Sequence, residues 1–273
     1  MNVAYKCVVL NTKGGAGKST VSAQIMAPFL YQLSATTPVI YEFDDENQES
    51  RHFGGSTIFS SERITVGYRD LRDEVTEIML NDKTACIDVG ANKTAKAVME
   101  ALIDSRMIYR IDLFVIPLMD GEVDAQSAYE VYKAFKDAYP ELKIVFALGR
   151  TNQARDLYCQ FDMFLGDRRG IFQKAGVLEQ VDAVDRSYFL VPDSDVVKYS
   201  RLFGVTIWEL ATNSKDVDSE LKVAIQNGSD NSVIKLLSFK RGLKNDCDLY
   251  LQNAIIPAFE VLTNKINEKR LYD

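Results

Sequence analysis

The sequence is poor in the residues that build metal centres and disulfide frameworks. It has a single histidine, His52, and four widely separated cysteines, Cys7, Cys86, Cys159 and Cys247. A Ser-His-Asp triad or a multi-histidine metal site would depend on His52 alone, and no two cysteines have the spacing of a zinc or redox pair. We therefore expect mostly buried thiols rather than a disulfide framework or a zinc site.

Long apolar runs are also missing. Runs such as Leu113–Met119 and Ile144–Leu148 fall far short of the roughly 20 residues that a membrane-spanning helix needs. The first residues, Met1–Lys6, lead into an apolar stretch without a signal-peptide cleavage site, so we expect a cytoplasmic protein. With 47% hydrophobic and 26% charged residues, the composition excludes collagen-like and mostly disordered chains. The net charge of −7 argues against a wholly basic nucleic-acid binder but allows a local basic patch.

Short apolar runs alternate with amphipathic stretches along most of the chain. The expected strands are Tyr5–Leu10, Pro38–Phe43, Thr84–Val89, Leu113–Leu118, Lys143–Leu148 and Tyr188–Val191. The expected helices between them are Ser19–Leu33, Tyr68–Leu80, Thr94–Tyr109, Asp124–Ala138, Leu157–Phe164 and Ser194–Leu202. This order predicts a doubly wound α/β fold, with a mostly parallel sheet and helices on both faces. Such sheets bind ligands beyond the carboxyl ends of their strands, so the residues that follow each run are the candidates for a site.

Beyond Ile207 the pattern becomes helical. Helices are expected over Val217–Gln226, Ser232–Phe239 and Leu249–Asn267, and we find no further strand, internal repeat or low-complexity linker. The simplest organisation is one domain over residues 1–273, with residues 208–273 as its helical C-terminal extension.

A glycine-rich segment follows the first apolar run. Residues 11–20 read Asn-Thr-Lys-Gly-Gly-Ala-Gly-Lys-Ser-Thr, between an expected strand and an expected helix, which is the setting of a phosphate-binding loop. The glycines let successive N–H groups point at one anion, and the helix N-terminus adds partial positive charge. Lys18 is expected to reach the β- and γ-phosphates, and Ser19 to offer its hydroxyl to Mg²⁺. The expected phosphate-binding residues are Gly14, Gly15, Ala16, Gly17, Lys18, Ser19 and Thr20.

Two residues of this loop depart from the general motif G-x-x-x-x-G-K-[ST]. Thr12 stands at the first glycine position, and Lys13 precedes the glycine pair. The run N-x-K-G-G-x-G-K-[ST]-[ST] closely resembles the deviant phosphate loop of the ParA/MinD family of ATPases. The resemblance implies slow ATP hydrolysis by a homodimer that holds ATP between its subunits. It also implies that Lys13 crosses the dimer interface to the phosphates of the partner's nucleotide.

Acidic residues follow the second and third apolar runs. The resemblance matches Glu42 and Asp44 to the family's D-x-D, which implies that Asp44 lies near the attacking water and the metal, with Asp45 as its rival. Asp88 ends a buried strand, where the Mg²⁺-side carboxylate of a phosphate-loop NTPase belongs, and Gly90 could bring a backbone N–H to the γ-phosphate. The expected catalytic residues are Lys13, Lys18 and Asp44, and the expected Mg²⁺ ligands are Ser19, Asp44 and Asp88. The Asp-Val-Gly-Ala run at residues 88–91 looks like the StbB-type plasmid-stability branch.

Two later segments are similar to the family's adenine-binding positions. The run Val-Pro-Asp-Ser-Asp-Val-Val at residues 191–197 resembles I-P-x-D-x-x-V, which implies that Pro192 and Asp193 lie beside the base. Arg150 and Asn152 follow the fifth apolar run, at the other expected base-reading position. Together these resemblances cover roughly residues 5 to 207.

The C-terminal part carries a basic cluster of Lys235, Lys240, Arg241 and Lys244. Through these residues the resemblance implies non-specific DNA binding when an ATP-bound dimer aligns two clusters, since phosphate neutralisation needs cations but no base code. Acidic residues nearby leave a merely solvated face as the alternative. The last residues have mixed charge and little apolar surface, so membrane binding is not expected.

The function implied by the resemblance is an ATP-driven switch that positions or partitions cargo, above all plasmid DNA. It would work with a small adaptor or DNA-binding partner protein. The alternative is a nucleotide-sensing adaptor with little ATPase activity that recruits partners to a conjugation or segregation complex. A metabolic enzyme of the same superfamily would need a substrate pocket or paired cluster cysteines, and the dispersed cysteines argue against the iron-protein type.

Overall fold

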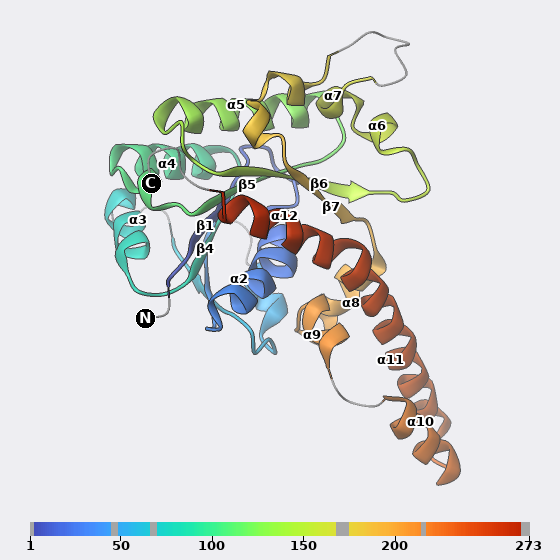
Figure 1. Ribbon diagram of the computed structural model, residues 1–273. Helices are drawn as coiled ribbons and strands as arrows, with labels where there is room; N and C mark the ends of the chain where they lie inside the picture. The colour runs from blue at the N-terminus through green and yellow to red at the C-terminus, as the bar shows by residue number, and fades with distance from the viewer. Residues whose placement is uncertain (1–2, 45–48, 66–69, 168–174, 214–216, 269–273) are drawn as a thin grey trace.

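A parallel sheet forms the centre of the molecule. The computed structural model describes residues 3–44, 49–65, 70–167, 175–213 and 217–268. Within them the strands form one seven-stranded parallel sheet in the order β3-β2-β4-β1-β5-β6-β7 (Figure 1). The strands are β1 Lys6–Val9, β2 Val39–Phe43, β3 Ser60–Arg63, β4 Ala85–Val89, β5 Leu113–Leu118, β6 Ile144–Thr151 and β7 Tyr188–Pro192. The expected fold class is confirmed.

Helices connect the strands and extend the chain beyond the last of them. The α-helices are α1 Lys18–Val21, α2 Ala27–Ser34, α3 Leu71–Leu80, α4 Asn92–Asp104, α5 Glu122–Ala138, α6 Leu157–Gln160, α7 Asp162–Leu165, α8 Asp195–Phe203, α9 Ile207–Thr212, α10 Val217–Gln226, α11 Asn231–Tyr250 and α12 Ile256–Ile266. Two π-helical turns, η1 Ser22–Met26 and η6 Leu251–Ile255, join α1 to α2 and α11 to α12. Short 3₁₀ turns are η2 Glu49–Phe53, η3 Met107–Arg110, η4 Val177–Gln180 and η5 Ala183–Asp185.

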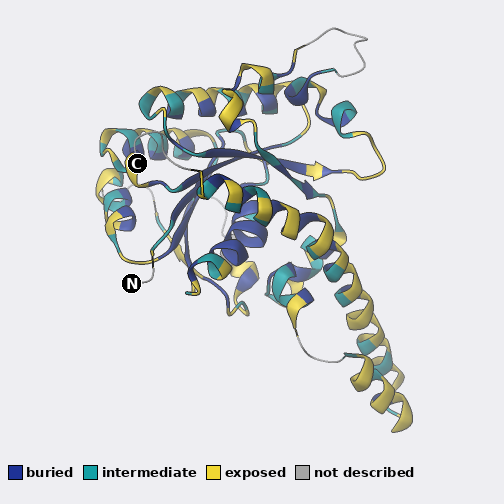
Figure 2. Cartoon of the chain, viewed as in Figure 1, coloured by how far each residue is buried: buried dark blue, intermediate teal, exposed yellow. Residues whose placement is uncertain are grey.

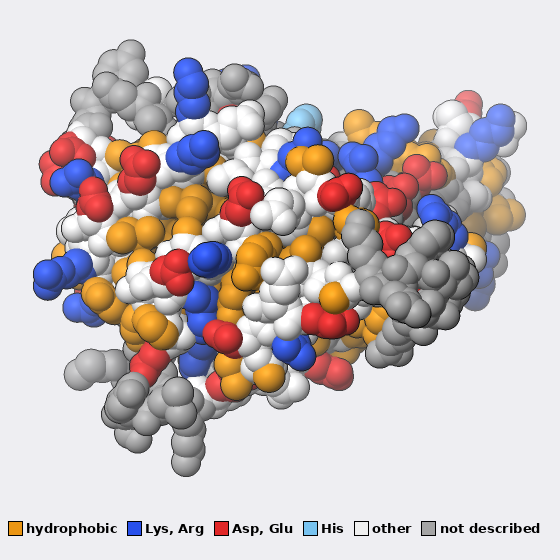
Figure 3. All heavy atoms as spheres, turned by 90° about the horizontal axis from the view of Figure 1, so that it is seen from above, with side chains coloured by type: hydrophobic (Ala, Val, Ile, Leu, Met, Phe, Trp, Pro, Cys, Tyr) orange, Lys and Arg blue, Asp and Glu red, His pale blue; other side chains and the backbone are white. Residues whose placement is uncertain are grey.

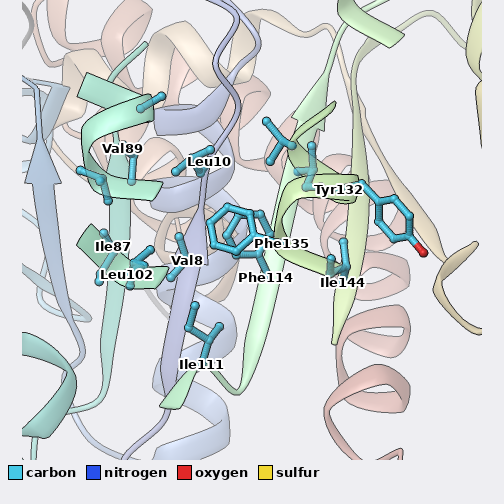
Figure 4. Packing of buried hydrophobic residues seen from close by; sticks show 14 of the residues in the cluster. Val8, Leu10, Ile87, Val89, Leu102, Ile111, Phe114, Tyr132, Phe135 and Ile144 are labelled. Carbon is cyan, nitrogen blue, oxygen red and sulfur yellow. The ribbon is translucent and has the colours of Figure 1, made fainter. Parts of the chain in front are cut away.

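Both faces of the sheet are covered because successive side chains of its buried strands are apolar. In β1, Val8 packs in the cluster beneath α3, α4, α5 and α7, whereas Val9 packs in the cluster beneath α2, α8, α9 and α12. Figure 4 shows Phe114 of β5 against Phe135 of α5, with ring centroids 4.3 Å apart. Burying each such ring contributes roughly 1.5–3 kcal/mol.

Strand β3 was not predicted from the sequence. Its four residues, Ser-Ser-Glu-Arg, are polar and exposed, so they form no apolar run. The strand pairs with β2 at the edge of the sheet. Exposed charges on an edge strand hinder pairing with another chain.

The helical C-terminal part differs in detail from the prediction. Helix α11 spans 20 residues and joins the expected helix Ser232–Phe239 to the start of the next one. Helices α10 and α11 pack on each other and project from the sheet (Figure 1). Much of their surface is exposed (Figure 2). Helix α12 returns to lie against β6 and β7 and buries Ala258 and Leu262.

The strand order creates a crevice between β1 and β4. After β1 the chain enters α1 and α2 on one face of the sheet, whereas after the neighbouring β4 it enters α4 on the opposite face. A crevice opens at the carboxyl ends of strands where adjacent connections diverge in this way.

Candidate functional site

A cleft of about 850 Å³ lies at this crevice. Its walls come from the carboxyl ends of β2, β4, β6 and β7, from the segments that follow β1, β2, β4, β5 and β7, and from one face of α8. Thirteen of the residues predicted for the site line it: Gly14, Gly15, Ala16, Gly17, Lys18, Ser19, Thr20, Asp44, Asp88, Gly90, Arg150, Pro192 and Asp193. Residues from five strand ends therefore meet in one place, although they are spread over most of the sequence.

The loop after β1 has the backbone of an anion-binding turn. Gly15 and Gly17 have φ values of 77° and 84°, in the left-handed region that glycine adopts without strain. Gly17 is the N-cap of α1, so the first helical amides face the cleft. Lys18 is only 8% exposed, and burial lowers its pKa while Asp88 and Asp44 raise it. Its Nζ donates a hydrogen bond to the carbonyl oxygen of Lys13 at 3.1 Å, across the turn.

Asn11 anchors the base of this loop. Its buried side chain donates through Nδ2 to the carbonyl oxygen of Pro117 at 2.7 Å and accepts from the backbone N–H of Lys13 at 3.0 Å. The Lys13 side chain is half-buried, but it does not line the cleft of its own chain. The structure therefore brings the other loop residues together without Lys13.

Asp88 has the character of a metal ligand. It is 5% exposed, and its Oδ1 accepts no hydrogen bond from any residue that the structure describes. Burial raises its pKa to about 7; the hydroxyls of Ser19 and Ser22 and the charge of Lys18 lower it, and Glu42 raises it. A bound cation would supply the missing partner of this oxygen and favour its charged form.

The donor set fits Mg²⁺ that binds together with a phosphate. In the described ranges there is no group of three or more His, Cys, Asp or Glu residues that could hold an ion. Mg²⁺ commonly takes one or two protein oxygens and completes its shell with water and substrate phosphates. Ser19, Asp44 and Asp88 are the residues that would hold it here, since all three line the cleft.

The ends of β2 and β4 touch at Gly90. Its N–H donates to the carbonyl oxygen of Phe43 at 2.7 Å, and a Cβ at this position would lie 2.8 Å from that oxygen and 3.2 Å from Cγ of Asp44. Asp44 accepts a hydrogen bond at its own carbonyl from Nε of Arg63 at 3.2 Å. The position of Asp44 therefore depends on both neighbouring strands. Asp45, its predicted rival, lies outside the described residues.

The two predicted base-reading segments differ in where they lie. Arg150 lines the cleft from an irregularity between β6 and β7, with a left-handed φ of 54°. Such strain in a non-glycine residue is frequent at functional sites. Asn152 does not line the cleft, and its Oδ1 accepts from the N–H of Ala154 at 2.9 Å within a turn. Pro192 and Asp193 lie at the end of β7 and line the cleft.

Several cleft residues were not singled out from the sequence. Glu42 was matched to the family's first aspartate without a role of its own, and no motif in the sequence indicated Met119, Lys198 or Arg201. Met119 lies against the phosphate loop, with its Cε 3.0 Å from where a Cβ on Gly17 would stand. Met119 could have been predicted because it directly follows the strand Leu113–Leu118. Lys198 and Arg201 could not, because they belong to α8 and are part of no motif.

The basic cluster lies on α11 and is partly neutralised. Arg241 pairs with Asp218 of α10 at 2.5 Å. Lys244 pairs with Asp248 at 3.3 Å and donates to the carbonyl oxygen of Ala211 at 2.9 Å. Among described residues, Lys235 and Lys240 make no ion pair, and both are exposed. The face shown in Figure 3 also intermixes basic, acidic and hydrophobic side chains.

None of the helices in the described part of the chain is long and apolar enough to cross a bilayer.

Comparisons with known proteins agree on the fold. No protein-family model matches the sequence, and no curated protein matches it. Among solved structures, apo McdA from Cyanothece is 12% identical over 77% of this chain and 94% of its own, with a TM-score of 0.53. The MinD cell division protein of Aquifex aeolicus is 15% identical over 74% and 87%, with a TM-score of 0.47. A ParA family ATPase from Chlorobium tepidum is 14% identical over 78% and 94%, with a TM-score of 0.47.

The resemblance to the ParA/MinD family is thus confirmed at the level of fold. The structural similarity to McdA is the comparison that supports it. The roles of individual residues therefore rest on the geometry of the cleft.

Proposed function

We propose that the chain binds ATP with Mg²⁺ in the cleft, hydrolyses it slowly, and uses the bound ATP to hold two copies together. The observation that carries this proposal is the convergence in one cleft of the phosphate loop, the buried Lys18 and the carboxylates of Asp44 and Asp88. Positive charge and loop amides suit a polyphosphate, and carboxylates beside them suit its metal ion.

Each group would have one task in hydrolysis. The loop amides and Lys18 bind the β- and γ-phosphates, and Asp44 orients the attacking water. Bound Mg²⁺ would neutralise charge that develops on the phosphates. The N–H of Gly90 is bonded to Phe43, so Gly90 keeps the ends of β2 and β4 in register and fixes the direction of Asp44.

The exclusion of Lys13 from its own cleft supports a role across a dimer interface. A lysine that served its own nucleotide would line that cleft, as Lys18 does. We propose that Lys13 contacts the partner's phosphates and that the dimer positions or partitions cargo, foremost plasmid DNA through the basic cluster.

Two substitutions test this function. Lys18→Ala should abolish binding of labelled ATP in a fluorescence titration, because the β- and γ-phosphates lose their main counter-charge. Lys13→Ala should retain that binding but lose the ATP-dependent dimer seen by analytical ultracentrifugation. Near-normal ATP affinity of Lys18→Ala would show that the loop is misassigned. Measurable dimerisation with no turnover in the unaltered chain would favour the adaptor instead.

Asp44→Ala is expected to stop turnover while retaining dimerisation and most of the ATP affinity, because Asp44 is assigned to the water, whereas the phosphate loop, Ser19 and Asp88 still hold the nucleotide and its Mg²⁺. A phosphate-release assay measures this. If Asp45→Ala stops hydrolysis and Asp44→Ala does not, the roles of these two residues are exchanged.

A further inference from the structure

Helix α8 forms a second wall of the cleft. Asp195, Val197, Lys198 and Arg201 of this helix line it, and Arg201 lies three residues after Lys198 and four after Val197, on the same face of the helix. Lys18, Asp44 and Asp88 also line the cleft, but they belong to other elements of the fold. Arg201 and the phosphate loop therefore reach the cleft from different elements of the fold.

Arg201 is hydrogen-bonded to the phosphate-loop helix. Its Nη2 donates to Oγ1 of Thr20 at 3.2 Å, between residues 181 positions apart in the chain. Thr20 lies in the first turn of α1, two residues after Lys18, and also lines the cleft. The contact thus joins the α8 wall to the element that presents amides to the phosphates.

The buried side chain of Gln24 joins η1, the helical turn that continues α1, to α8 and α9. Gln24 of η1 donates through Nε2 to Oγ of Ser200 at 2.9 Å, and its Oε1 accepts from the N–H of Ile207 at 2.8 Å. Gln24 and Ser200 are both fully buried. Because Ser200 immediately precedes Arg201, this clamp holds the backbone from which the guanidinium reaches Thr20. Support of this kind is what positions a functional side chain reproducibly.

The direction of the bond determines what the Thr20 hydroxyl can do. A hydroxyl has one hydrogen to donate and two lone pairs that accept. A guanidinium can only donate, so Oγ1 of Thr20 is the acceptor in this contact, and its hydrogen remains available for another acceptor. A donor that is itself hydrogen-bonded through its oxygen is polarised and binds an acceptor more strongly.

We propose that Arg201 is a positioning residue that orients the Thr20 hydroxyl to donate to a phosphate oxygen of the bound nucleotide. This inference rests on the proposed function. Because Arg201 acts through Thr20 on a phosphate that nucleoside diphosphates and triphosphates share, and not on Asp44 or Asp88, it contributes equally to binding of both and has little part in the hydrolytic step.

The first experiment compares Arg201→Ala with Leu202→Ala, a matched control on the same helix whose side chain is 72% exposed and does not line the cleft. Affinities for fluorescent ATP and ADP are titrated, and turnover is measured at saturating ATP. Arg201→Ala should weaken both nucleotides by about tenfold, the usual loss for a hydrogen bond to a charged group, with kcat within about twofold of the unaltered chain. Leu202→Ala should change neither affinity. Unchanged affinities of Arg201→Ala, or weakening of ATP alone, would overturn the proposal.

Two further variants separate hydrogen bonding from packing. Arg201→Met keeps a long side chain without donors and should behave as Arg201→Ala, whereas Arg201→Lys keeps a donor and should retain most of the affinity. Normal affinity of Arg201→Met would mean that the side chain merely packs, which refutes the role.

A double-mutant cycle tests the route through Thr20. Thr20→Val removes the hydroxyl, so Arg201→Ala on that background should cause no further loss. A full additional tenfold loss would place Arg201 on the nucleotide itself and refute positioning through Thr20. Failure of the unaltered chain to bind either nucleotide would remove the proposed function as well, whereas normal binding with no Arg201 effect removes this inference alone.

Discussion

Replacing Gly90 by alanine adds one methyl group, which should lower turnover while leaving ATP binding intact. A Cβ there would stand 2.8 Å from the carbonyl oxygen of Phe43 and 3.2 Å from Cγ of Asp44. Ordinary carbon–oxygen contacts are about 3.3–3.6 Å, so Gly90→Ala requires the ends of β2 and β4 to separate by about 0.5 Å or more. That movement stretches the 2.7 Å bond from the Gly90 N–H to Phe43.

The cost follows from the size of this overlap. Forcing one extra methyl group into a packed site costs about 1–3 kcal/mol, which for a chain of this size corresponds to a fall of roughly 2–10 °C in Tm. Turnover should suffer more than binding, because Asp44 moves while the phosphate loop does not. Since displacement of about 1 Å can cost 100-fold in rate, we expect kcat to fall about tenfold with ATP affinity retained.

The assay combines differential scanning fluorimetry, labelled-ATP titration and phosphate release. Gly242→Ala is the matched control, because a Cβ at Gly242 of α11 meets no atom within 4 Å. That variant should keep its turnover and gain up to about 1 kcal/mol of helix stability. Normal Tm and turnover in Gly90→Ala would refute the contact between the two strand ends.

Three other perturbations test separate parts of the molecule. Asp185→Ala should lower the free energy of unfolding by about 2–3 kcal/mol in urea titrations, because it removes the carboxylate 2.9 Å from the buried Lys265 and leaves Lys265 paired with Glu268 at 2.8 Å; a loss below about 1 kcal/mol would contradict this. Burial raises the pKa of Asp88 from 3.8 to about 7, so the folded chain binds a proton that the unfolded chain has released, and stability should fall as pH rises from about 4 to about 7. Asp88→Asn should abolish that part of the pH dependence in nucleotide-free and Mg²⁺-free protein, and parallel profiles of the two proteins would rule it out. Lys235→Glu with Lys240→Glu should remove ATP-dependent DNA binding in gel shifts without lowering basal ATPase activity. Four phosphate contacts per subunit would give a slope of log K against log salt of about −7 for a dimer, at roughly −0.9 per contact. Because Arg241 and Lys244 are paired to acids, two contacts per subunit should give a slope of about −4 instead. DNA binding that survives the double substitution would exclude this patch.

The sequence predicted the buried sheet well because each central strand is a continuous apolar run. Leu113–Leu118 is fully buried and has the bounds that its composition indicates. Strand β3 escaped prediction because its pairing with β2, rather than any apolar pattern, makes it a strand. The expected helix Leu157–Phe164 is broken into α6 and α7 because the backbone of Phe161, with φ −114° and ψ 39°, leaves the helical conformation.

The candidate site was predictable wherever its residues directly follow a strand. Asp88 and Gly90 could be found because the carboxyl ends of parallel strands share one edge of the sheet. Arg201 could not, since its place in the cleft depends on how α8 packs against η1 rather than on any motif. The pairing of Arg241 with Asp218 was hidden for the same reason, because it requires α10 to fold back along α11.

The central position of β1 has a consequence for synthesis of the chain on the ribosome. Among the strands of this sheet β1 is synthesised before the others, yet in the finished sheet it lies between β4 and β5, and the anchor of its loop, Asn11, bonds to Pro117. The nucleotide site therefore takes shape only after the chain has grown the 106 residues from Asn11 to Pro117, which takes several seconds or more at about 5–20 residues per second. One edge of β1 has no partner until β4 has emerged, and the other has none until β5 has emerged. Before that point ATP cannot assist folding. A nascent chain stalled before β5 should thus be a substrate for chaperones rather than for nucleotide.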